Sequence, residues 1–250
     1  MTSISKIALA CAALVAASGA FAQKAGDNIV SVGLAMVRPS TSAGPVTTTS
    51  TGDGGANGTA LTNYLKDTSA HLSNENTISF GLLHMFTDDI GGEFTLGVPP
   101  RVTQDLTAPN LPNLLGGPNH PNAAKVDVWT PTAVAKYFFG TAQDKWRPYA
   151  GFGVSRVSFH NISTLNDGGT VDALAKRGAN FTSSWAPVYN LGVIYNIDEK
   201  WSINGSASYI PIKTTATFLG NSSTGNYPLT TTSDIKINTM DYVVRLGYRF

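Results

Sequence analysis

The feature of this sequence that most constrains its fold is a strict two-residue alternation between apolar residues and small polar ones. Such alternation indicates a β-strand whose two faces meet different surroundings. It is clearest at 30–36, 77–82, 93–98, 189–197, 201–209 and 239–250, and the extended segments 126–139 and 147–160 alternate less regularly. We therefore predict an all-β chain of eight strands.

The connections between these segments differ in length in a regular way. Short turns are predicted at 87–92, 140–146 and 198–200, and long polar connections at 39–75, 99–125, 161–184 and 214–234. Three tight turns on the side of both termini and four long loops on the other side describe an up-and-down barrel. Residues 45–59 are nearly low-complexity and are expected to be mobile, whereas 171–177 has the residues for one or two helical turns.

Composition indicates what surrounds such a barrel. Only 13% of the residues are charged and 42% are hydrophobic, whereas roughly 25% charged residues is ordinary for a soluble domain. The net charge of +1 argues against a nucleic-acid partner, which requires a basic surface. Small polar residues inside and Leu, Val, Phe and Tyr outside are typical of a membrane barrel. The sequence therefore predicts an eight-stranded antiparallel up-and-down transmembrane β-barrel with four long extracellular loops and three short periplasmic turns.

The N-terminal segment reads as a secretory signal peptide, 1–22, which leaves 23–250 as one barrel domain. Lys6 ends a short positive region, an apolar core follows, and Ala20-Phe21-Ala22 supplies small residues at the cleavage site. The apolar core is shorter than the about 20 residues that a membrane-spanning helix needs. Cys11 is the only cysteine and is removed with this segment, so we expect no disulfide and no thiolate metal site.

The C-terminal strand resembles the last strand of outer-membrane barrels, with Phe250 at the end and Tyr248 two residues before it. This resemblance implies that the two residues form an assembly signal for the barrel-assembly machinery. More specifically, the chain resembles the outer membrane protein W family throughout 27–250, apart from the loops. The segments that carry the resemblance are Val37-Arg38-Pro39, Thr87-Asp88-Asp89-Ile90-Gly91, Arg147-Pro148-Tyr149-Ala150-Gly151-Phe152-Gly153, Asp198-Glu199-Lys200-Trp201-Ser202-Ile203-Asn204 and Leu246-Gly247-Tyr248-Arg249-Phe250.

The resemblance implies a function in the outer membrane of a Gram-negative bacterium. Members of the family are thought to pass small hydrophobic molecules inward and to release them sideways into the bilayer, and the family includes alkane-uptake barrels. We therefore expect a porin-like channel for passive uptake of small hydrophobic molecules. The alternative is a structural or receptor barrel that binds a bacteriocin, a phage or a host surface without transport.

Alternation also predicts which side chains line the lumen. Apolar and polar candidates occur together, so we expect a mixed lumen, which argues against a strictly alkane-like solute. The candidates are Leu83, Met85, Glu93, Thr95, Val188, Asn190, Ile194, Asn204, Ser206, Ser208, Val243 and Arg245.

Two prolines are candidates for a lateral opening in the barrel wall. If 198–200 is a tight turn, Pro187 faces Pro211 across neighbouring strands. Each proline removes a donor from the hydrogen-bond ladder. The two prolines therefore predict either an opening towards lipid or, if they lie above the membrane, an edge that water satisfies.

The remaining predictions concern partners and chemistry. Expected partners are the bilayer, lipopolysaccharide, the assembly machinery and small hydrophobic solutes, and the barrel is expected to be a monomer. The histidines lack ligand spacing and no nucleophile motif occurs, so we expect no metal, no cofactor and no enzymatic activity. Basic residues that either pair with lipopolysaccharide phosphates or simply lie in water above the apolar belt are Arg38, Arg101, Lys125, Arg156 and Lys213.

Overall fold

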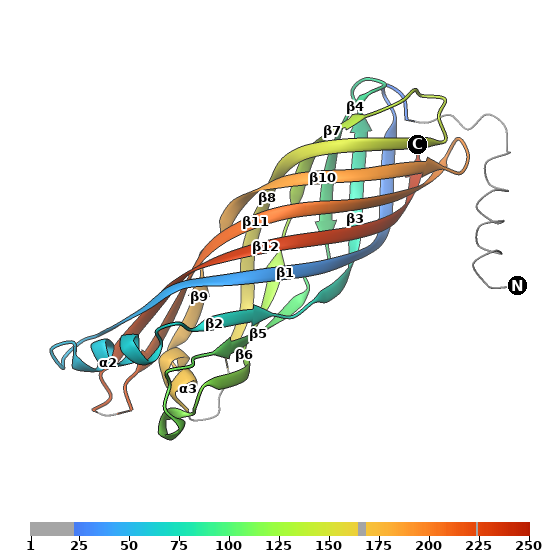
Figure 1. The fold of residues 1–250 in the computed structure, drawn as a ribbon. Coiled ribbons are helices and arrows are strands. Elements are labelled where there is room, and N and C mark those ends of the chain that lie inside the picture. Colours follow the sequence, from blue (N-terminus) through green and yellow to red (C-terminus); the bar gives the residue numbers. More distant parts are fainter. Residues whose placement is uncertain (1–22, 165–168, 224) are drawn as a thin grey trace, which may run out of the picture.

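The computed structural model describes residues 23–164, 169–223 and 225–250, so the predicted signal peptide lies outside the described residues (Figure 1). Eight antiparallel strands form a closed ring, because β8 and β10 also pair with each other. This confirms the predicted barrel. The ring consists of β1 (Asn28–Ser50), β3 (Glu75–Met85), β4 (Ile90–Gly97), β7 (Thr132–Phe138), β8 (Trp146–Thr164), β10 (Ser184–Asn196), β11 (Trp201–Asn221) and β12 (Pro228–Arg249).

The other elements lie at the end of the barrel that is far from the C-terminus (Figure 1). Here β5 pairs with β2 and β6, β6 pairs with β8, and β9 pairs with β11. The long connections therefore form a folded extracellular part rather than four irregular loops. Its elements are α2 (Ala56–Tyr64), β2 (Ser69–Leu72), β5 (Arg101–Thr107), a short 3-10 helix (Asn113–Leu115), β6 (Asn119–Trp129), α3 (Thr170–Ala175) and β9 (Gly178–Phe181).

The expected strand 126–139 is wrong as one element. The chain leaves β6 at Trp129, passes through Thr130 and Pro131, and enters β7 at Thr132. Proline has no amide hydrogen for a central ladder, so a strand rarely continues through it. The segment therefore forms two strands: β6 pairs with β5 in the extracellular part, and β7 pairs with β4 in the barrel.

Residues 45–59 are also more regular than their composition predicted. β1 continues to Ser50 because its threonine-rich end pairs residue by residue with β12. Asp53 then accepts hydrogen bonds from the backbone amides of Asn57 and Gly55 and from the Ser50 hydroxyl, next to the start of α2. These bonds, chiefly the one from Asn57, hold the pKa of the Asp53 carboxyl well below its usual range. The helical turns expected at 171–177 are present as α3.

The three tight turns occur where the sequence predicted them, between β3 and β4, β7 and β8, and β10 and β11. In the last turn, the Asp198 carboxylate accepts hydrogen bonds from the amides of Trp201 and Lys200, each at 2.7 Å. These two backbone bonds lower the pKa of Asp198. The turn fixes the register of β10 on β11.

The outer face of the ring is apolar. Large hydrophobic side chains recur at alternate positions of the barrel strands, where the chain itself leaves them exposed, as expected for a face that meets lipid. In the described residues, no helix is both long and apolar enough to cross a membrane. The outward residues include Val30, Val32, Leu34, Ile78, Phe80, Leu82, Phe152, Leu191, Ile203, Val244 and Leu246.

One glycine lies at a very close approach between β1 and β12. A Cβ atom on Gly33 would lie 1.9 Å from the carbonyl oxygen of Val244, whereas a Cβ on Gly205 of β11 would have no atom within 4 Å. The backbones at Gly33 would have to separate to admit a side chain.

We predict that Gly33→Ala lowers the free energy of unfolding by about 2 kcal/mol, since overpacking costs about 1–3 kcal/mol. Gly205→Ala is the matched control and should change it by less than about 0.5 kcal/mol. Urea unfolding of the barrel in lipid vesicles, followed by tryptophan fluorescence, measures both. Equal effects of the two substitutions would contradict the close approach.

Candidate functional site

All predicted lumen residues lie inside the barrel. Nine of them are buried, and the other three, Thr95, Ser206 and Ser208, line an internal cavity. They do not form one continuous lining, however. From the periplasmic end outward, eleven of them belong to an apolar plug, a charged cluster and a chamber. The twelfth, Asn204, accepts a hydrogen bond from the hydroxyl of the plug residue Tyr149 at 2.9 Å. The nine buried candidates are Leu83, Met85, Glu93, Val188, Asn190, Ile194, Asn204, Val243 and Arg245.

The charged cluster, which we call the Glu93 lock, crosses the interior of the barrel above the plug. The Glu93 carboxylate lies 2.6 Å from Lys136 Nζ of β7 and 2.9 Å from Arg245 Nη1 of β12. Arg245 Nε also donates a hydrogen bond to Ser79 Oγ at 3.1 Å. The Lys136 ammonium lies 4.2 Å from the centre of the Tyr149 ring. Three strands are therefore joined through one buried carboxylate.

The periplasmic end below the lock is filled with side chains. Arg147 is fully buried and donates hydrogen bonds to the backbone oxygens of Gln23, at 2.6 Å, and Asp88, at 2.8 Å. The Gln23 side chain donates in turn to Asn196 Oδ1 at 2.8 Å. Between this layer and the lock lies an apolar plug of Ile29, Leu83, Met85, Phe138, Tyr149 and Ile194.

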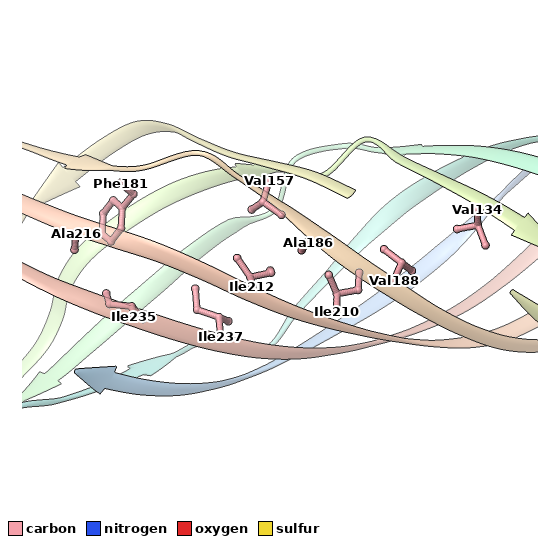
Figure 2. Packing of buried hydrophobic residues seen from close by; sticks show 10 residues of the cluster. All are labelled: Val134, Val157, Phe181, Ala186, Val188, Ile210, Ile212, Ala216, Ile235 and Ile237. Carbon is pink, nitrogen blue, oxygen red and sulfur yellow. The ribbon is translucent and has the colours of Figure 1, made fainter. Parts of the chain in front are cut away.

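A cavity that we call the barrel chamber lies above the lock. It holds about 1450 Å³, including the part open to solvent, and Glu93 and Arg245 are the innermost residues of its lining. Its lining includes none of the plug residues. Figure 2 shows that apolar side chains follow one another along this part of the interior. Those that line the chamber in Figure 2 are Val134, Phe181, Val188, Ile210, Ile212, Ile235 and Ile237.

A second cavity, the outer chamber, adjoins the first within the extracellular part. It holds about 760 Å³ and shares Ala70, Gln104 and Ile235 with the barrel chamber. Most of its lining is apolar, including Leu65 and Phe218. Together the chambers form an apolar path from the extracellular part to the Glu93 lock.

The predicted facing of the two prolines agrees with the observed strand register. The last pair between β10 and β11 is Tyr189 with Tyr209. Continued by two residues, the same register places Pro187 opposite Pro211. Beyond an unpaired interval, β9 pairs with β11 from Phe181 and Ala216. On the inner side of this interval lie the buried residues Ala186, Val188, Ile210 and Ile212. A lateral opening here stays a prediction.

A second interruption of the wall was not predicted from the sequence. Pairing between β4 and β7 ends at Thr95 and Thr132. The same two segments of chain pair again as β5 and β6, beginning where the Val128 amide donates to the Pro100 carbonyl at 3.1 Å, so a short unpaired interval lies between. Val98 lies beside this break, is 49% exposed and also lines the barrel chamber. Val98 thus connects the lining of the barrel chamber with an exposed position beside this interval.

The sequence reasoning missed several interior residues. Lys136 was not predicted because the sequence reading joined β7 and β6 into one strand at 126–139. Within β7, the inward residues alternate and are Thr132, Val134, Lys136 and Phe138. Gln104, at the junction of the chambers, lay in an expected loop. His71 and His120 were also expected in loops, but His71 lies in β2 and His120 is buried in β6.

The remaining site predictions concern the basic surface residues and the C-terminal residues Tyr248 and Phe250. The Phe250 amide donates to the Asn28 carbonyl at 3.0 Å, and Tyr248 packs on Trp201. Their role in assembly stays a prediction, as does lipopolysaccharide binding by the basic residues. Of these, Arg101 pairs with Asp127 and Arg156 lies over the Trp185 ring. No cluster of three or more potential metal ligands occurs among the described residues.

Comparisons with known proteins agree with this architecture. The model of the OmpW family matches residues 24–250. Outer membrane protein W of Salmonella typhi is 31% identical over 211 residues, 84% of each chain. Outer membrane protein AlkL of Ectopseudomonas oleovorans is 26% identical over 183 residues, 73% of this chain and 69% of that protein.

Among solved structures, the crystal structure of OprG from Pseudomonas aeruginosa superposes with a TM-score of 0.72 at 24% identity. The match covers 92% of this chain and 98% of OprG. The closed ring, its apolar outer face and these matches lead to one conclusion: the chain belongs to the OmpW family and is a β-barrel of the bacterial outer membrane.

Proposed function

We propose that this barrel is a passive uptake channel for small hydrophobic molecules, which leave it sideways into the membrane. The observation that carries the proposal is the apolar path of two adjoining chambers that ends at the Glu93 lock. An apolar solute gains free energy as it leaves water for such a lining, by about 25 cal/mol for each Å² of apolar surface removed from water.

The filled periplasmic end supports sideways release. A solute that went straight on would have to pass a buried ion-pair cluster and the packed plug below it. The break between β4 and β7 offers a route from the barrel chamber to the lipid-facing surface beside Val98. Because the membrane interior is itself apolar, the solute need not enter water again.

The first test is selective uptake. Cells that produce the barrel should take up radiolabelled naphthalene several-fold faster than cells without it. Proteoliposomes containing the barrel should not swell in arabinose above the lipid-only rate, since the lock and plug block an aqueous path. Naphthalene uptake equal to that of cells without the barrel would instead favour a structural or receptor role.

The second test locates the exit. Val98→Trp should reduce naphthalene uptake at least five-fold by filling the break between β4 and β7, whereas Val98→Ala should leave it within two-fold. The double variant Pro187→Ala, Pro211→Ala restores two donors between β10 and β11 and tests the other opening. A decrease only in the proline variant would place the exit there, and unchanged uptake in all variants would contradict sideways release.

The third test concerns the lock. Glu93→Gln leaves Lys136 and Arg245 buried without their shared carboxylate, and loss of one partner of a buried pair costs about 3–5 kcal/mol. We expect the free energy of unfolding, measured in urea, to be about 3 kcal/mol lower than that of the native barrel. Glu199→Gln, in an exposed turn, is the control and should have no measurable effect. A stable Glu93→Gln barrel would show that the lock does not hold the strands together.

A further inference from the structure

Two hydrogen-bond acceptors inside the barrel chamber have no partner among the residues that the structure describes. Asn190 Oδ1 and Asp241 Oδ1 are both buried, and no donor in the described residues reaches either atom. Both residues line the chamber. Buried acceptors without donors are costly, and an ionisable residue at membrane depth usually marks a functional site.

Strand register brings these acceptors to one place. Asn190 of β10 pairs with Ser208 of β11, and Ser208 pairs with Asp241 of β12. The three residues therefore form one row across three neighbouring strands. Ser208 also lines the chamber.

The orientation of the Asn190 amide explains why its oxygen is free. Its Nδ2 donates to Ser208 Oγ at 2.8 Å and to the Ala207 carbonyl at 3.3 Å. With the amide nitrogen held by these two bonds, Oδ1 is left as an acceptor. The row thus offers an amide oxygen, a hydroxyl oxygen and a carboxylate.

Asp241 shares the barrel interior with the positively charged Glu93 lock. The Glu93 lock combines two cations with one carboxylate, so it carries one excess positive charge. Asp241 lies on the same strand and face as Arg245, about 13 Å away at 3.3 Å per residue.

We propose that Asn190, Ser208 and Asp241 bind the ammonium group of a small apolar amine in the barrel chamber. An ammonium group carries three donors and a positive charge, which match the three acceptors and the carboxylate. An alcohol supplies only one donor, and a carboxylate supplies none. The hydrocarbon part would lie against the apolar lining, including Ile210 and Val243.

This inference rests on the proposed uptake function and names one class of its solutes. The test uses the full barrel in lipid nanodiscs at pH 7, with the methyl groups of Val188 and Val243 as NMR reporters. Each reporter lies two residues from Asn190 or Asp241 on the same face and lines the chamber. The probes are n-hexylammonium, n-hexanol and n-hexanoate.

We expect n-hexylammonium to bind at least ten-fold more tightly than n-hexanol, and n-hexanoate most weakly. Asp241→Asn should bring n-hexylammonium within two-fold of n-hexanol and leave n-hexanol unchanged. The control is Asp234→Asn, because Asp234 lies on the same strand but is exposed and bonded to Thr215. It should retain the ten-fold preference.

Asn190→Val provides a second variant should Asp241→Asn fail to fold, and it should weaken n-hexylammonium binding several-fold. If n-hexanol binds the native barrel and n-hexylammonium binds no better, the amine site is wrong while the hydrophobic channel stands. If none of the probes shifts the reporters, the chamber does not bind such solutes, and both the amine site and the proposed function fail.

Discussion

Every other property of this barrel depends on closure of its hydrogen-bond ring. A lipid interior offers no partner to a free amide or carbonyl, so spanning strands must pair on both edges. The β8–β10 and β1–β12 pairings leave no open edge in the ring as a whole. Against that background, the two unpaired intervals, at Pro187 and Pro211 and beside Val98, are local and lie next to the extracellular part.

Closure with eight strands also limits the interior. A ring of this size leaves little more room than side chains can fill. In this chain the periplasmic half is filled by the plug and the lock, whereas the outer half retains two cavities. This asymmetry supports uptake from outside that ends within the membrane.

The sequence identified the barrel strands best where one face meets lipid. On β12, large residues alternate from Tyr242 to Tyr248, and that period predicted both the strand and the inward position of Arg245. It failed at 126–139, because Pro131 joins strands of two different sheets and the period changes there. The alternation also could not predict that Glu93 pairs with Lys136. The sequence of one strand does not show which strand lies next to it, nor which residues of the two strands face each other.

By itself, the sequence determined that this chain is a membrane barrel, where the tight turns lie and, on the strands with clean alternation, which residues face inward. The physical reason is that lipid imposes its requirement on every second residue of each strand. The folding of 39–75 and 99–125 into helices and strands was decided by tertiary structure, because those segments are ordered by pairing with distant strands. The same holds for the lock, the chambers and the row of Asn190, Ser208 and Asp241, which exist only once register brings separate strands together.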